Sequence, residues 1–323
     1  MPWVLGLDGG GTRTVALIAN EKGRVLGRGE SGSANYHTAG LAAASESVSQ
    51  AVHAAITDAG LVEPALSAAF FALAGVDRPI DRQVMSGAIA RTELHCPLQL
   101  AHHATATLAG ATGGQPGVVV IAGTGAIAYG EDGQGNQARA GGYGPLLGDE
   151  GSGYDIGRKA LIAAMRAEDG RGPDTMLRDR IKQRFLLEHM ADLINLVYGN
   201  PAPLQRSEIA GLAPMLMQAA REGDAIAREI LRIAGRELGL AAAAVLQRLR
   251  WESGKPVLVA GSGPVFTAGS ILTLPMEQVI RSVCPQAEMS QPRHTPAYGA
   301  VLLALRLLGI RPDEVPGERT PQS

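Results

Sequence analysis

The sequence contains very little cysteine and no strong excess of charge of either sign. Cys96 and Cys284 are the only two cysteines in 323 residues, and they are far apart, without the close spacing of metal ligands. A zinc or iron–sulfur site is therefore not expected, and both residues are predicted to be buried thiols in a reducing compartment. The formal net charge of -2 argues against a broad basic face, so nucleic acid is not an expected partner.

Long hydrophobic runs are missing as well. No apolar run reaches the roughly 18 residues that a membrane-spanning helix needs, and the N-terminus lacks a basic segment followed by an apolar one. We therefore expect a cytoplasmic protein with no membrane partner. The chain is 46% hydrophobic and 19% charged, a balance typical of globular proteins, and its length predicts two domains with a cleft between them.

The N-terminal segment, residues 4–17, consists of two apolar strands joined by an acidic, glycine-rich turn. Three consecutive glycines at 9–11 would let the backbone adopt positive φ and approach a phosphate closely, while Thr12 offers a hydroxyl. Asp8, at the end of the first strand, is placed to orient a metal hydrate or a water. An ordinary hairpin turn is the alternative, because Asp-Gly pairs also mark such turns.

Strand and helix patterns follow this turn. They predict strands over 24–28, 68–74 and 98–101, and helices over 41–59, 78–91 and 104–111. The order then restarts, with strands predicted over 118–122, 126–130 and 137–140 around a second glycine turn at 123–125. This restart predicts an internal structural duplication. Beyond it we expect helices over most of 154–249, with a turn at 221–224, a strand over 257–260, a helix over 297–308 and a polar tail after 312.

A glycine-rich segment, residues 141–153, carries adjacent carboxylates and leads into the helix predicted from Tyr154. Its backbone amides and the carboxylate of Asp149 could surround a polar ligand such as a sugar, and the ring of Tyr143 could stack on a pyranose face. A flexible linker is the alternative interpretation of the segment, and a core or interface tyrosine is the alternative for Tyr143.

These motifs resemble those of the sugar kinase, actin and heat-shock ATPase superfamily, in the branch that contains N-acetylglucosamine kinase and the BadF/BadG/BcrA/BcrD ATPases. The resemblance covers nearly the whole chain and rests on residues 8–12, 123–125, 259–262 and 298–300 and, most specifically, on 141–144 with 148–152. It implies an α/β fold of two actin-like (ribonuclease H-like) domains, each with a mixed five-stranded sheet flanked by helices. The first domain would comprise residues 1–112 and 293–323, closed by the C-terminal helix, and the second residues 113–292 with a helical insertion.

The resemblance also implies roles for individual residues. ATP would be bound by Gly9, Gly10, Gly11, Thr12, Gly123, Thr124, Gly125, Ala220, Gly261 and Ser262. The sugar would be contacted by Asn35, Gly142, Tyr143, Gly144 and Asp149, although a turn-stabilising role is the alternative for Asn35. Mg²⁺ would bridge the phosphates through waters held near Asp8. Relatives of this kind further suggest a homodimer.

The chain departs from the family pattern where the acceptor hydroxyl would be activated. Family members carry an acidic residue followed by alanine there, and its carboxylate takes the proton from the sugar hydroxyl. In this chain His103 precedes Ala104, and Ala126 stands where such kinases can carry serine. His103 could itself be the base, since an unperturbed imidazole titrates near pH 6.5. Otherwise Asp149 could be the base while His103 binds substrate, or the site could bind ligands without efficient transfer.

The predicted function is ATP-dependent phosphorylation of an amino sugar hydroxyl, with N-acetylglucosamine or glucosamine favoured by the resemblance. One alternative is a BadF-type ATPase that drives an activator or electron-transfer partner, although the cysteines do not lie where an intersubunit iron–sulfur cluster would need them. Another is a catalytically weakened sugar or nucleotide sensor, suggested by His103. A dinucleotide-binding dehydrogenase is disfavoured, because a strand pattern follows the first glycine turn where that fold requires a helix.

Overall fold

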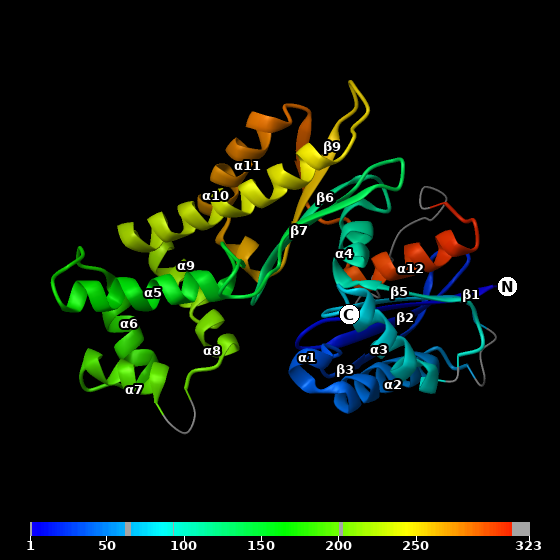
Figure 1. The fold of residues 1–323 in the computed structure, drawn as a ribbon, viewed down its shortest axis with the longest axis horizontal. Coiled ribbons are helices and arrows are strands. Elements are labelled where there is room, and N and C mark those ends of the chain that lie inside the picture. Colours follow the sequence, from blue (N-terminus) through cyan, green and yellow to red (C-terminus); the bar gives the residue numbers. More distant parts are fainter. Residues whose placement is uncertain (1, 62–65, 93, 200–202, 312–323) are drawn as a thin grey trace. The chain divides into compact units, whose positions relative to one another are not determined.

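The computed structural model describes residues 2–61, 66–92, 94–199 and 203–311, so the polar tail predicted after residue 312 lies outside the described residues. The chain divides into two compact units (Figure 1). Unit 1 comprises residues 1–117 and 291–323, and unit 2 comprises residues 118–290. Of the helices in the described ranges, none is both long and apolar enough to cross a membrane.

Unit 1 is built on a sheet with the strand order β3-β2-β1-β4-β5. Strand β1 pairs antiparallel with β2, β2 antiparallel with β3, β1 parallel with β4, and β4 parallel with β5. The strands are β1 (Trp3–Gly9), β2 (Thr14–Asn20), β3 (Val25–Ser31), β4 (Leu66–Leu73) and β5 (Leu98–His102). The helices are α1 (Tyr36–Ala39), α2 (Leu41–Asp58), α3 (Pro79–Ile89), η1 (Ala90–Thr92), α4 (His103–Thr112) and α12 (Pro296–Leu307).

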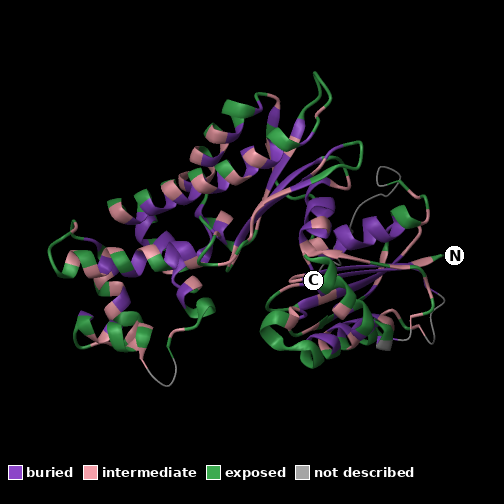
Figure 2. Cartoon of the chain, in the orientation of Figure 1, coloured by how far each residue is buried: buried purple, intermediate pink, exposed green. Residues whose placement is uncertain are grey.

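Helices cover both faces of this sheet, which explains why β4 is apolar at every position except Ser67. On one face Phe71 belongs to a core cluster formed with residues of α2 and α3. On the other face Phe70 belongs to a cluster with residues of α4 and α12, including Val301. Figure 2 shows the result, with the strands of the sheet buried between helices whose outer surfaces are exposed.

Unit 2 is built on a second sheet, with the strand order β10-β9-β6-β7-β8. The strands are β6 (Gly117–Ala122), β7 (Ala126–Glu131), β8 (Gln137–Gly141), β9 (Val257–Ser262) and β10 (Ala287–Ser290). The helices are α5 (Gly153–Glu168), α6 (Met176–Phe185), η2 (Met190–Asp192), α7 (Leu193–Tyr198), α8 (Arg206–Ala210), α9 (Ala213–Arg221), α10 (Ala225–Arg248), η3 (Pro264–Ala268) and α11 (Ser270–Val283).

The two sheets repeat one topology. If the five strands of each unit are counted in chain order, both sheets have the spatial order third, second, first, fourth, fifth. The predicted internal duplication is therefore confirmed in the connectivity of the strands, and so are the two mixed five-stranded sheets flanked by helices. The predicted turn at 221–224 is also confirmed, since α9 ends at Arg221 and α10 begins at Ala225.

The sequence pattern does not predict α11 or β10. Pro275 lies inside α11, where it removes a backbone hydrogen bond and argues against a helix. The helix forms all the same, because Leu272, Met276 and Ile280 are buried in the core of unit 2. The expectation of two buried thiols is half right, since Cys284 is buried and Cys96 is only partly so.

Replacing Gly299 by alanine is expected to separate α12 from α4. A Cβ at this position would lie 2.0 Å from the Ala106 carbonyl oxygen and 2.4 Å from the Gly110 amide nitrogen, and neither backbone atom can rotate away. Such overpacking costs about 1–3 kcal/mol, which thermal unfolding would detect. Gly87→Ala in α3 is the matched control, because its Cβ meets nothing within 4 Å. Equal unfolding midpoints for the two variants would contradict this packing argument.

Candidate active site

The carboxyl ends of β1, β4 and β5 meet at one edge of the unit 1 sheet. These strands run parallel, with Gly9 of β1 opposite Leu73 of β4, and Leu73 opposite His102 of β5. The Ala74 amide donates to the Gly9 carbonyl oxygen at 2.7 Å, which ties the loop after β4 to the end of β1. Parallel pairing thus brings Asp8, the 74–78 loop and the histidine pair to the same edge, where ligands bind in open α/β sheets.

Asp8 carries an unsatisfied buried oxygen at this edge. Its Oδ1 has no hydrogen-bond partner among the described residues. Burial raises the pKa of Asp8 to about 7, against the opposing effect of the Arg13 guanidinium. An orphaned carboxylate oxygen of this kind fits a hydrated cation. Within the described ranges, no group of three or more His, Cys, Asp or Glu side chains could hold a metal ion, so a cation here would rely on waters and ligand oxygens.

The first glycine turn is a hairpin connection between β1 and β2, in which the Gly10 amide donates to the Arg13 carbonyl oxygen at 2.9 Å. The expectation of positive φ is wrong, since φ is positive at none of the three described glycines, residues 9–11. Gly9 is needed for packing, because a Cβ there would lie 2.5 Å from a Leu73 methyl carbon. Gly11 has open space around it and Thr12 is exposed. The hairpin alternative is thus confirmed as the local geometry, and phosphate binding stays a prediction.

Asn35 is the N-cap of the short helix α1. Its Oδ1 accepts a hydrogen bond from the His37 amide at 3.1 Å, so the turn-stabilising role is confirmed. Gly75 packs directly against it, since a Cβ on Gly75 would lie 2.7 Å from that same oxygen. Gly75 also has φ of 79°, a conformation that favours glycine. The Asn35 side-chain amide could still donate to a sugar hydroxyl, which remains a prediction.

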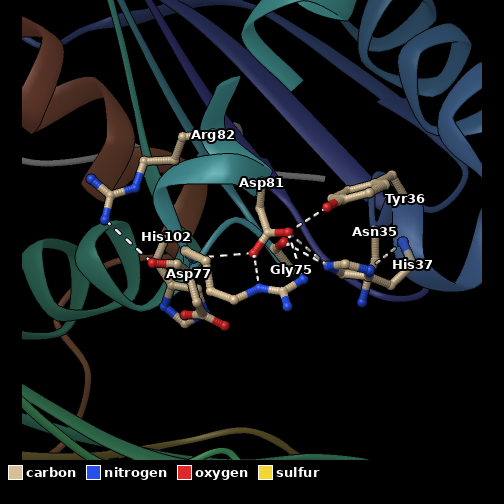
Figure 3. Close-up of polar contacts among 9 residues, drawn as sticks. Asn35, Tyr36, His37, Gly75, Asp77, Asp81, Arg82 and His102 are labelled. Carbon is tan, nitrogen blue, oxygen red and sulfur yellow. Dashed lines mark hydrogen bonds and ion pairs between the residues drawn. The ribbon is translucent and has the colours of Figure 1, made fainter. Parts of the chain in front are cut away.

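A buried carboxylate, missed by the sequence reasoning, joins the Asn35 loop to the loop after β4 (Figure 3). Asp81 accepts a hydrogen bond from the Tyr36 hydroxyl. It also accepts two hydrogen bonds from the Arg78 guanidinium, both at 2.8 Å. His37 Nε2 lies 3.4 Å from the same carboxylate. These partners, Arg78 above all, hold the pKa of Asp81 well below its usual range. The Arg-Pro pair at the start of α3, with Asp three residues after the arginine, was the available signal.

His102 and His103 stand at the junction of β5 and α4, and Asp77 of the loop after β4 reaches them. Nδ1 of His102 accepts from the Ala104 amide at 3.2 Å, and Nε2 lies 3.1 Å from Asp77 Oδ1 (Figure 3). The His103 ring lies edge-on to that of His102, with centroids 4.5 Å apart. Burial, reinforced by His102 and opposed by Asp77, lowers the pKa of His103 to about 3. His103 is therefore neutral at physiological pH.

Unit 2 holds a pocket of about 240 Å³ at its own glycine turn. The lining combines small residues at the turn and the start of α5 with apolar side chains from α9 and the loop after β9. The lining residues are Gly123, Thr124, Gly153, Ser207, Ala210, Gly211, Ala213, Pro214, Met217, Pro264 and Val265. The 16-residue helix α5 begins at this turn, and a helix N-terminus favours an anion such as phosphate.

Of the residues expected to bind ATP in unit 2, Gly123 and Thr124 line this pocket. Gly261 and Ser262 end β9, directly before the lining residues Pro264 and Val265. Ala220 is fully buried one turn beyond Met217, so α9 presents Ala213, Pro214 and Met217 to the pocket instead. The role of Ala220 was implied by the resemblance, and its contact with ATP stays a prediction.

Asp149 is buried and held on two sides. Its Oδ1 accepts from the Ala126 amide at 3.1 Å, and its other oxygen pairs with the Arg206 guanidinium. Burial raises the pKa of Asp149, while the Ala126 amide and Arg206 oppose that effect. Gly125 makes room for the pair, because a Cβ there would lie 2.7 Å from the Arg206 guanidinium and 3.0 Å from the Asp149 carboxylate. Arg206, at the start of α8, was not among the predicted site residues.

The segment that follows β8 presents Tyr143 to solvent. Its side chain is 59% exposed, and the Arg139 guanidinium lies 5.5 Å from the ring centroid. Gly142 and Gly144 flank it with positive φ, and a Cβ on Gly142 would press against Ile127 at 3.0 Å. The alternative of a buried core tyrosine is therefore wrong, and the ring is open to a ligand or to another surface.

Two mixed five-stranded sheets of one topology, each with a glycine turn after its first strand, define a two-unit actin-like ATPase fold. The sequence profile of the BadF/BadG/BcrA/BcrD ATPase family matches residues 5–304, and the chain belongs to that family, as the motifs predicted.

Characterised relatives extend over almost the same length. The chain is 32% identical to N-acetylmuramic acid/N-acetylglucosamine kinase of Clostridium acetobutylicum, over 94% of this chain and 98% of that protein. It is 31% identical to N-acetyl-D-glucosamine kinase of Dictyostelium discoideum, over 93% and 97%. A solved structure from Chromobacterium violaceum, provisionally named an N-acetylglucosamine kinase, has a TM-score of 0.68 and 28% identity over 94% of this chain and 99% of that one.

The raised pKa of Asp8 predicts a pH-dependent loss of stability. The unfolded state loses this proton near pH 4 and the folded state near pH 7, so stability falls as pH rises between these values. Chelator-treated wild-type protein should lose on the order of 2 kcal/mol through this group between about pH 5.5 and about pH 8. Asp8→Asn has no ionisable group at this position and should lose less stability over the same pH range. Thermal unfolding at each pH measures the difference. Parallel pH profiles of the two proteins would contradict the assignment.

Proposed function

We propose that this protein is an ATP-dependent kinase that phosphorylates a hydroxyl of an amino sugar. The observation that carries the proposal is the unit 2 pocket, which joins a glycine turn and a helix N-terminus to apolar walls. The turn suits a polyphosphate, and the apolar residues Met217, Pro264 and Val265 suit a purine. Near full-length similarity to sugar kinases supports the same reading of the pocket.

The residues of each unit supply different parts of this activity. In unit 2, Thr124 would contact the nucleotide phosphates, and the Arg206–Asp149 ion pair lies beside Gly125 of the same turn. In unit 1, Asp8 would hold the waters of a Mg²⁺ ion, for which its orphaned buried oxygen is suited. Bound Mg²⁺ neutralises phosphate charge during transfer.

An amino sugar is the proposed acceptor. The relatives named above are kinases of N-acetylglucosamine and N-acetylmuramic acid, and Asn35 and Tyr143 offer an amide and an exposed ring of the kind that binds a pyranose. The homodimer and the cytoplasmic location stay predictions.

Purified protein with Mg-ATP should release ADP faster when an amino sugar is present. The reason is that transfer depends on positioning an acceptor hydroxyl at the γ-phosphate, which water replaces poorly. A panel of N-acetylglucosamine, glucosamine and N-acetylmuramic acid, with glucose as the comparison sugar, would be followed by ADP release and by mass spectrometry of the sugar phosphate.

The alternatives would give different results in this panel. ADP release that no sugar stimulates would contradict the kinase and favour an ATPase. If calorimetry shows that sugar and nucleotide bind but no ADP is released, a sensor would be favoured.

Thr124→Val should weaken the binding of ATP without unfolding the protein. Thr124 is exposed and lines the pocket, so the change removes a hydroxyl and little else. Loss of one such hydrogen bond costs about 1–1.5 kcal/mol, which corresponds to roughly a tenfold rise in KM for ATP. Thr57→Val, at an exposed position of α2, is the matched control. An unchanged KM for ATP in Thr124→Val would show that the nucleotide binds elsewhere.

A further inference from the structure

A carboxylate from a different loop contacts His102, the residue next to His103, where the expected aspartate is missing. Asp77 lies four residues beyond the end of β4, and its Oδ1 is 3.1 Å from Nε2 of His102 (Figure 3). Because β4 and β5 are parallel neighbours, the loop after β4 meets the start of α4 at the same sheet edge. The Asp77 side chain is 31% exposed, so a solute can reach it.

His102 orients this carboxylate. Its Nδ1 accepts from the Ala104 amide, so in the neutral ring the proton is on Nε2 and points at Asp77. His102 therefore orients the Asp77 carboxylate, in the way that a second residue orients many catalytic bases.

The segment on either side of Asp77 is held by buried or bonded neighbours. Gly75 packs against Asn35, and its carbonyl oxygen lies 3.1 Å from His37 Nε2. Arg78 is fixed to Asp81 by two hydrogen bonds, and Arg82 donates to the Asp77 carbonyl oxygen at 3.3 Å. A side chain supported in this way can be held in a productive orientation.

His103 is poorly suited to accept a proton. Burial and the adjacent His102 lower its pKa to about 3, because an imidazolium there would lose much of its hydration beside a second ring.

We propose that Asp77, oriented by His102, is the general base of the reaction. The inference rests on the proposed kinase function. As the acceptor hydroxyl oxygen bonds to the γ-phosphorus of ATP, the bond from that phosphorus to the β,γ-bridging oxygen breaks and its electron pair leaves with ADP. The hydroxyl proton passes to the Asp77 carboxylate and then to solvent.

Asp77→Asn should lower kcat at least a hundredfold with N-acetyl-D-glucosamine as acceptor, since general bases contribute about 10²–10⁴-fold. The KM for ATP and the circular dichroism spectrum should stay at wild-type values. Asp174→Asn, at an 82% exposed carboxylate in unit 2, is the matched control and should keep wild-type kcat.

The kcat of the double variant Asp77→Asn with His103→Asp distinguishes a general base from a structural role, because a structural defect would not be repaired by a new carboxylate. The double variant places a carboxylate at the first residue of α4, and its kcat should be at least tenfold higher than that of Asp77→Asn. His102 is tested as a positioning residue: His102→Ala should lower kcat, and His102→Gln, which keeps an N–H donor, should recover part of the loss.

The outcomes separate this inference from the proposed function. Acceptor-stimulated turnover in wild type that persists within threefold in Asp77→Asn would overturn the role of Asp77 and leave the kinase intact. A loss in Asp77→Asn that His103→Asp cannot recover would assign Asp77 a structural role. Wild-type protein without any acceptor-stimulated ADP release would overturn the kinase and the base together.

Discussion

The parallel pairing of β1, β4 and β5 is the constraint on which the candidate site of unit 1 depends. Their register sets Gly9, Leu73 and His102 side by side, so that everything following these strands begins at one sheet edge. Glycine allows the tight contacts there, since a Cβ on Gly9 or Gly75 would collide with neighbouring side chains. A slip of one residue in β1 would turn every side chain of that strand to the opposite face, and Asp8 with them.

The second unit repeats this arrangement and adds a pocket. Its glycine turn also follows the first strand of a sheet with the same connectivity, but here the α5 N-terminus and an apolar wall complete a pocket. The Asp149–Arg206 pair lies against Gly125 and so links the glycine-rich segment 141–153 to the turn at 123–125. One topology thereby positions two different sets of loops, and it is in such loops that binding residues commonly lie.

Local patterns were sufficient for much of this. The apolar strand β4, the alanine-rich α2 and the glycine turns predicted their elements and the duplication, because hydrophobic periodicity and turn chemistry act within a few residues. Helix α11 escaped because Pro275 contradicts a helix locally and only burial against the unit 2 core offsets it. The buried position of Asp81 was not predicted, because its partner Tyr36 is 45 positions away in sequence.

By itself, the sequence determined the fold class, the two glycine turns, the family and the replacement of the expected carboxylate by His103. Only the tertiary structure decided that Asn35 caps a helix, that Asp149 is held by Arg206, and that Asp77 meets His102. The reason is physical: motifs and periodicity report contacts between near neighbours in the chain, whereas burial and ion pairing depend on which loops the parallel sheet brings together. The pKa values of Asp8 and His103 follow from that burial and cannot be read from their residue types.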